Sequence, residues 1–199
     1  MCINLKTSIS AFLIGTLSSL ALIKSNNKEN NSIGQFILFY TFVQLFEALI
    51  YYNNLTIYSR LLLLNLGLQG LVFMIQLNNY TPIDKNYIYI CAIISIFITY
   101  KSLQTNFKKA TTEGCMKWNF FDNAIIKMLY VMYGMIFISM YHYSDKLNNI
   151  NKLSMLLILT YIISIYISKT KSLLCSINKP SIWCLSSALI APIMLLFNT

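Results

Sequence analysis

IGQFILFYTFVQLFEALIYY, residues 33–52, contains twenty residues and a single charge, that of Glu47. A helix needs about 20 mostly apolar residues to cross the hydrocarbon core of a bilayer, and this stretch has that length and composition. It is also too evenly apolar for a barrel strand, whose inward and outward side chains alternate in polarity. We therefore expect a transmembrane helix here, with an ionisable side chain inside it.

The composition of the whole chain agrees with a membrane environment. The 199 residues are 57 % hydrophobic and 11 % charged, with a mean hydropathy of +0.61, whereas soluble domains carry about 25 % charged residues. The five cysteines are odd in number and scattered, without a Cys-x-x-Cys spacing. This pattern argues against a disulfide framework and against a zinc module, and it predicts no cofactor.

Apolar runs recur along the whole chain. Seven candidate spans cover about 7–23, 33–52, 57–77, 87–100, 124–143, 153–168 and 181–197. Only helices or closed barrels satisfy backbone polar groups in lipid. The sequence therefore predicts an all-α fold, a polytopic transmembrane helix bundle of about seven spans without strands. Residues 1–199 would form one integral membrane domain, since no polar block is long enough for a soluble module.

The first run has an alternative interpretation as a cleaved signal peptide. Lys6 precedes its apolar core, and Ser19-Leu20-Ala21 ends in small residues. The core is longer than the roughly 7–15 residues of a signal sequence, which favours a retained span.

Positive charge in the loops predicts the orientation of the bundle. The N-terminus and the second, fourth and sixth loops carry nine cationic residues: Lys6, Arg60, Lys101, Lys108, Lys109, Lys117, Lys169, Lys171 and Lys179. The other side carries five: Lys24, Lys28, Lys85, Lys146 and Lys152. The positive-inside rule then predicts a cytoplasmic N-terminus and an external C-terminus.

The same loop charge predicts the partner of the chain. The formal net charge of +9 belongs to loops that face anionic lipid, so the expected partner is the lipid bilayer, with no nucleic acid. Association with further copies or with other membrane chains stays open, and the sequence does not indicate a ligand.

Polar residues near the cytoplasmic ends of three runs form a candidate recess. Its members are Gln44, Glu47, Asn65, Gln69 and Lys127. Gln44 shares a helix face with Glu47, and Asn65 with Gln69, because residues three or four apart are neighbours on a helix. An unpaired charge in hydrocarbon costs at least about 2.5–3.5 kcal/mol, so we expect Glu47 and Lys127 to pair. The group either lines a functional recess or joins helices as interhelical hydrogen bonds do.

Four short elements carry a resemblance to a known family. They are Met1-Cys2-Ile3-Asn4 with Ser8, Gln44-Leu45-Phe46-Glu47, Gly114-Cys115-Met116-Lys117-Trp118, and Ser181-Ile182-Trp183-Cys184. In their order the chain resembles an uncharacterised family of small seven-span membrane proteins of giant DNA viruses and some protists. That family usually has Trp, an acidic residue and often His where this chain has Ile3, Lys6 and Cys115. The resemblance implies the seven-span architecture and, because the family has no assigned activity, no function.

The predicted topology places several elements of this pattern at the cytoplasmic end. The candidate cytoplasmic-face residues are Cys2, Lys117, Trp118, Trp183 and Cys184. A functional site would gather residues in this way, and so would an interfacial belt of Trp with positive-inside Lys.

Several membrane classes do not fit the sequence. A retinal protein needs a Schiff-base Lys in its last span, and 181–197 contains no charged residue. Metal-dependent membrane enzymes need several His and acidic ligands, whereas the chain has one His, His142, and six acids.

Two hypotheses of function remain. The first is a non-enzymatic bundle whose polar recess passes a small solute or proton, or only fixes helix packing. The alternative is an intramembrane enzyme acting on lipid or thiol substrates, with Glu47 as acid or base and Cys184 or Cys2 as nucleophile.

Overall fold

The computed structural model consists mainly of long helices. It describes residues 5–53, 55–104, 110–112, 115–117, 123–143, 149, 152–153, 155–159 and 189–196. The elements are α1 (Leu5–Ile23), α2 (Lys28–Asn53), α3 (Thr56–Tyr80), α4 (Lys85–Gln104), β1 (Ala110–Thr112), β2 (Cys115–Lys117), α5 (Asn123–His142) and α8 (Ile190–Leu196).

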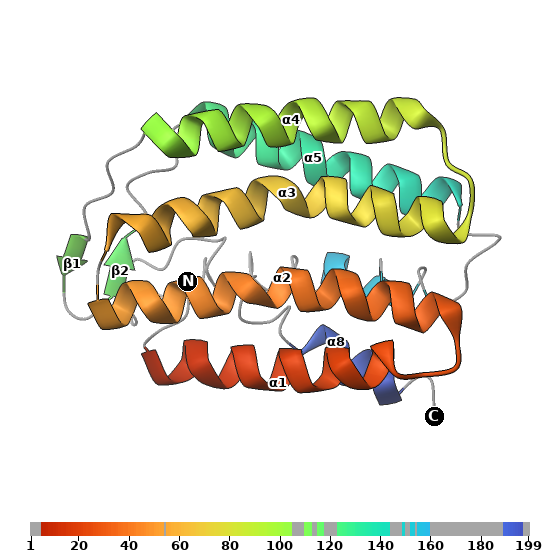
Figure 1. Cartoon of the computed structure of the whole chain (residues 1–199), viewed down its shortest axis with the longest axis horizontal. Coiled ribbons are helices and arrows are strands. Elements are labelled where there is room, and N and C mark those ends of the chain that lie inside the picture. The colour runs from red at the N-terminus through yellow and green to blue at the C-terminus, as the bar shows by residue number, and fades with distance from the viewer. Residues whose placement is uncertain are drawn as a thin grey trace.

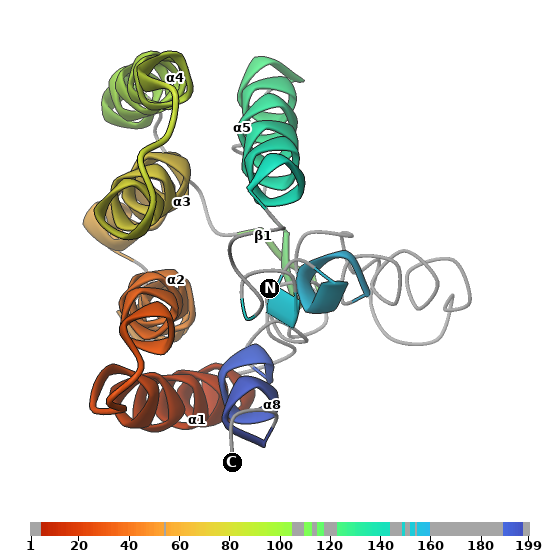
Figure 2. The same ribbon diagram turned by 90° about the vertical axis from the view of Figure 1, so that its right-hand side faces the viewer.

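The first four helices lie side by side in chain order, each running antiparallel to the one before (Figure 1). Viewed along the helices, α1 to α4 form a curved layer (Figure 2). Helix α5 packs against α3 and α4, and α8 packs against α1 and α2, so both lie on the same side of this layer. The short connections explain the order, because helices joined by a few residues pack as antiparallel neighbours.

Three helices in the described part of the chain, α1, α2 and α3, are long and apolar enough to cross a membrane. This finding supports the predicted membrane class, while the full count of seven spans stays a prediction. The first five predicted runs each overlap one of the helices α1 to α5, residues 155–159 of the sixth run are helical, and α8 lies within the seventh.

Helix α1 places its residues as a lipid-facing helix does. Its exposed face carries the large apolar side chains Ile9, Leu13, Ile14, Leu17 and Leu20. Its buried residues are the small Ser8, Ala11, Gly15 and Ser19, with one large side chain, Leu22, near the C-terminal end of the helix. Small residues at helix interfaces let backbones approach closely in membranes, where large apolar side chains gain nothing by leaving lipid. The pattern is the reverse of that in a water-soluble helix and supports a membrane setting.

Helices α1 and α2 approach each other closely at Gly34. A Cβ atom on this residue would lie 2.9 Å from the backbone nitrogen of Ile23 and 2.9 Å from Cβ of Leu22. Only glycine fits here without moving one of the helices. On the other side of α3, the Ser95 hydroxyl donates to the carbonyl oxygen of Gly67 at 2.7 Å and joins α4 to α3.

The prediction that the chain has no strand is wrong. Strands β1 and β2 form an antiparallel hairpin in the long connection between α4 and α5, with Ala110 opposite Lys117 and Thr112 opposite Cys115. Each strand has three residues, and only Glu113 and Gly114 stand between them in the sequence. Backbone polar groups must be satisfied by helices or closed barrels only in segments that span the lipid. In a connection outside them, backbone groups can pair locally, as this hairpin does.

Candidate functional site

A chain of buried and partly buried side-chain hydrogen bonds crosses from α5 through α3 to α2. The Tyr133 hydroxyl on α5 donates to Oε1 of Gln69 on α3. Gln69 Nε2 donates to Oδ1 of Asn65 at 3.3 Å, one turn earlier on the same helix. Asn65 Nδ2 in turn donates to the backbone oxygen of Phe39 on α2 at 3.1 Å. Gln69 is fully buried and Asn65 nearly so, which makes this chain a link among three helices.

Glu47 and Gln44 lie on the buried face of α2, as the sequence predicted for two residues three apart. Glu47 has 0 % of its surface exposed and Gln44 has 2 %. Val43 and Ile50, which share this helix face, belong to an apolar cluster with residues of α3. Glu47 is thus an ionisable side chain enclosed at a helix–helix contact.

The structure describes only part of the predicted cytoplasmic-side group. Lys127 lies on α5 near its first residues, toward the end of the bundle where α2 ends, but its side chain lies outside the described set. Lys117 lies in β2, where its backbone pairs with Ala110. The remaining members of the predicted cytoplasmic face, Cys2, Trp118, Trp183 and Cys184, lie outside the described residues. The Glu47–Lys127 pair therefore stays a prediction.

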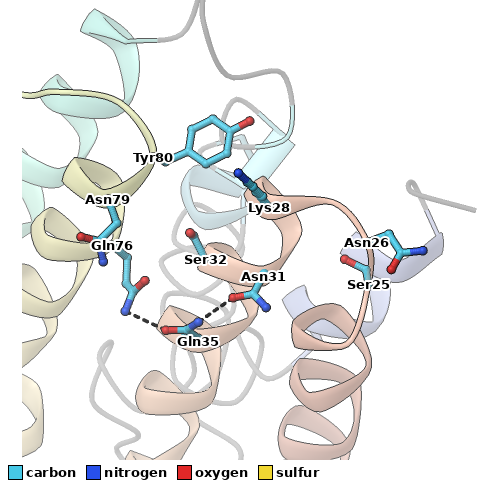
Figure 3. A pocket seen from close by; sticks show the side chains of 9 residues that line it. All are labelled: Ser25, Asn26, Lys28, Asn31, Ser32, Gln35, Gln76, Asn79 and Tyr80. Atoms are coloured by element: carbon cyan, nitrogen blue, oxygen red, sulfur yellow. Dashed lines mark hydrogen bonds between the residues drawn. The ribbon is translucent and has the colours of Figure 1, made fainter.

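A second polar region, which we call the loop recess, lies at the opposite ends of the helices. It has a volume of about 310 Å³. Its lining comes from the α1–α2 connection, the start of α2 and the end of α3: Ser25, Asn26, Lys28, Asn31, Ser32, Gln35, Gln76, Asn79 and Tyr80 (Figure 3). Every lining residue carries a polar group, which distinguishes this recess from the apolar surfaces around it.

Side-chain amides hold the walls of the loop recess together. Gln76 Nε2 on α3 donates to Oε1 of Gln35 on α2 at 2.9 Å, and Gln35 Nε2 donates to Oδ1 of Asn31 at 2.5 Å (Figure 3). Asn31 Nδ2 donates to the carbonyl oxygen of Ile23, the last residue of α1, at 2.6 Å. The chain joins three helices and leaves Lys28 and Tyr80 above it in this view.

The start of α2 is fixed by a side-chain cap. Oδ1 of Asn27 accepts from the backbone N–H of Glu29 at 2.8 Å and of Asn30 at 3.4 Å. Such a cap satisfies backbone donors that the first helical turn leaves without partners. It also keeps Lys28 at the edge of the recess.

The sequence predicted part of these two polar regions. The spacing of Asn65 and Gln69 correctly placed them on one face. Gln76, seven residues beyond Gln69 on α3, bonds to Gln35 at the loop recess and not to the chain through Gln69. The sequence did not predict that Tyr133 and Gln35 take part in these regions. The chain contains fourteen Tyr residues, and nothing in the neighbouring sequence distinguishes the one that meets α3.

Comparison with protein-family models, with curated proteins and with solved structures gave no match for this chain. Within the described residues, no group of three or more His, Cys, Asp and Glu side chains is placed to hold a metal ion.

Proposed function

We propose that this protein is a non-enzymatic, multi-pass membrane bundle of about seven spans that passes a proton or a small polar solute along the buried face around Glu47. One observation carries this proposal: Glu47 is an ionisable residue with no exposed surface, inside a helix of membrane-spanning length. Ionisable residues in such helices are rare and costly, and they commonly mark ion, proton or solute pathways.

The arrangement of α4 and α5 supports additional spans. Each has 20 residues, or about 30 Å at 1.5 Å per residue, and each packs against α3. A bilayer core has about this thickness. The proposed orientation keeps the N-terminus in the cytoplasm and the C-terminus outside, from the loop charges.

The chain from Tyr133 to Phe39 fits a structural part in this bundle. Its amide and hydroxyl groups use one another as donors and acceptors, so they join helices at little cost in lipid. Asn65 holds α3 to α2 at Phe39, eight residues before Glu47 or about 12 Å along the helix, so this chain fixes the two helices between which Glu47 lies. The enzyme alternative requires Cys2 or Cys184 beside Glu47, and both cysteines lie outside the described residues.

Proton uptake into proteoliposomes, followed with an enclosed pH-sensitive dye, tests the proposal. With an imposed membrane potential, the wild-type chain should acidify the lumen faster than empty vesicles, and Glu47→Gln should abolish the difference. Glu29→Gln provides a matched control, because Glu29 is also buried in α2 but lies at the other end of that helix. Wild-type vesicles that take up neither protons nor small polar solutes, or Glu47→Gln vesicles as active as wild type, would contradict the proposed function.

A further inference from the structure

The loop recess lies at one membrane interface. Helix α1 ends at Ile23, α2 begins at Lys28 and α3 ends at Tyr80. Each of these helices is long and apolar enough to span a membrane. The ends of spanning helices lie at the level of the lipid headgroups, where Tyr is enriched. Tyr80, with 38 % of its surface exposed, is such a residue. The recess is therefore reached both by lipid headgroups and by small solutes from the aqueous side.

The lining has the chemistry of an anion site. Lys28 is its one charged residue, and the other eight offer amide or hydroxyl groups. The acid nearest in sequence, Glu29, is absent from the lining and is 7 % exposed, with its side chain turned into the protein. A cation would meet Lys28 without a counter-charge, whereas a phosphate offers several acceptor oxygens to Lys28, Asn79, Ser32 and Tyr80. Charge-assisted hydrogen bonds of this kind are about twice as strong as neutral ones.

The walls of the recess are preorganised. The hydrogen bonds from Gln76 through Gln35 and Asn31 to the Ile23 carbonyl fix the ends of α1, α2 and α3 relative to one another. A volume of about 310 Å³ lies at the lower end of the range of small-molecule sites. It is large enough for a phosphate with part of the group it esterifies, and too small for a folded macromolecule.

We propose that the loop recess binds a phosphate monoester, with Lys28 as the charged contact and Asn79 and Ser32 as hydrogen-bond donors. The ester is supplied either by a lipid headgroup at the interface or by a soluble phosphate ester. This site is independent of conduction through Glu47, which lies twelve residues beyond Gln35 on α2, about 18 Å along the helix axis.

Thermal unfolding of the full chain in dodecyl maltoside tests the proposal, since a ligand that binds the folded state raises Tm with its concentration. The probes are dihexanoylphosphatidic acid, glycerol 3-phosphate and dihexanoylglycerol, which lacks the phosphate. The phosphate probes should raise Tm and dihexanoylglycerol should not. Binding of the lipid alone identifies a headgroup site, and equal binding of glycerol 3-phosphate identifies a soluble ester.

Variants locate the site. Lys28→Gln and Asn79→Ala should each raise the apparent Kd about tenfold, which is the effect of losing one hydrogen bond to a charged group. Lys24→Gln is the matched control, because Lys24 lies in the α1–α2 connection four residues before Lys28, is exposed and does not line the recess. Absence of a Tm rise with both phosphate probes, equal binding of dihexanoylglycerol, or equal losses for Lys24→Gln and Lys28→Gln would overturn the proposal.

Discussion

Tyr133 on α5 donates a hydrogen bond from its hydroxyl to Gln69 on α3, and this contact joins two residues that are 64 positions apart in the sequence. Gln69 has no exposed surface, so water does not replace a lost partner there. Through Asn65 the same chain reaches the backbone of α2. The position of α5 over the curved layer therefore depends on a polar contact in addition to apolar packing.

Tyr133→Phe should destabilise the protein by about 1–2 kcal/mol, because it leaves the buried Gln69 oxygen without its donor while changing little in shape. Chemical denaturation in mild detergent, followed by circular dichroism, measures the change. Tyr141→Phe makes the same substitution on the same helix at a residue that is 84 % exposed, and it should change stability by less than about 0.5 kcal/mol. Equal losses for the two variants would show that the Gln69 contact contributes nothing.

Gly34→Ala should cost about 1–3 kcal/mol, because the added methyl would meet the backbone of Ile23 and the side chain of Leu22 at 2.9 Å. Backbone atoms cannot move aside as a flexible side chain does, so α1 must separate from α2. Thermal unfolding in detergent measures the loss.

The control for this change is Gly134→Ala on α5, where an added Cβ meets nothing within 4 Å. This variant should be neutral or more stable by up to about 1 kcal/mol, since Ala has the higher helix propensity. A Gly34→Ala variant as stable as Gly134→Ala would mean that the two helices are not held in this close contact.

The apolar runs predicted where the helices lie more accurately than the residues at which the helices begin and end. The run at 33–52 lies within α2, but the helix begins five residues earlier, at Lys28. Those five residues, Lys28 to Ser32, are polar, so hydropathy assigned them to a loop, whereas the Asn27 cap makes them helical. Because a cap depends on a single side-chain oxygen, the mean hydropathy of a run does not reveal it.

The polar sites were predictable only within one helix. Spacing alone placed Asn65 with Gln69 and Gln44 with Glu47 on shared faces. Their partners on other helices, such as the Phe39 carbonyl and Tyr133, depend on which helices pack together. The loop recess was missed for the same reason, because it joins residues 25–35 to residues 76–80.

Loop charge predicts the orientation, and protease protection tests it. A tag fused to the N-terminus should be protected when protease is added outside intact cells, and a tag on the C-terminus should be cleaved, because the positive-inside rule predicts that the side with nine cationic residues faces the cytoplasm. Permeabilised cells, in which both tags should be cleaved, provide the control. Protection of both tags in intact cells would indicate an even number of spans and contradict the seven-span proposal.

The predicted pairing of Glu47 with Lys127 can be tested by a double-mutant cycle. Glu47 is fully buried on α2, and Lys127 lies on α5 toward the same end of the bundle. Breaking a buried ion pair costs about 3–5 kcal/mol, since the remaining charge stays in a medium of low polarity. Glu47→Leu and Lys127→Leu should therefore each lower the yield of folded protein and its stability in detergent.

The double variant, Glu47→Leu with Lys127→Leu, distinguishes pairing from two separate defects. If the two side chains pair, the double variant removes both charges together and should be more stable than either single variant by about 2 kcal/mol or more. Glu29→Leu with Lys127→Leu is the control, because Glu29 lies at the far end of α2 and should show only additive losses. Additive losses in the Glu47 cycle as well would show that Glu47 does not pair with Lys127. The proposed pathway along Glu47 would then not involve Lys127.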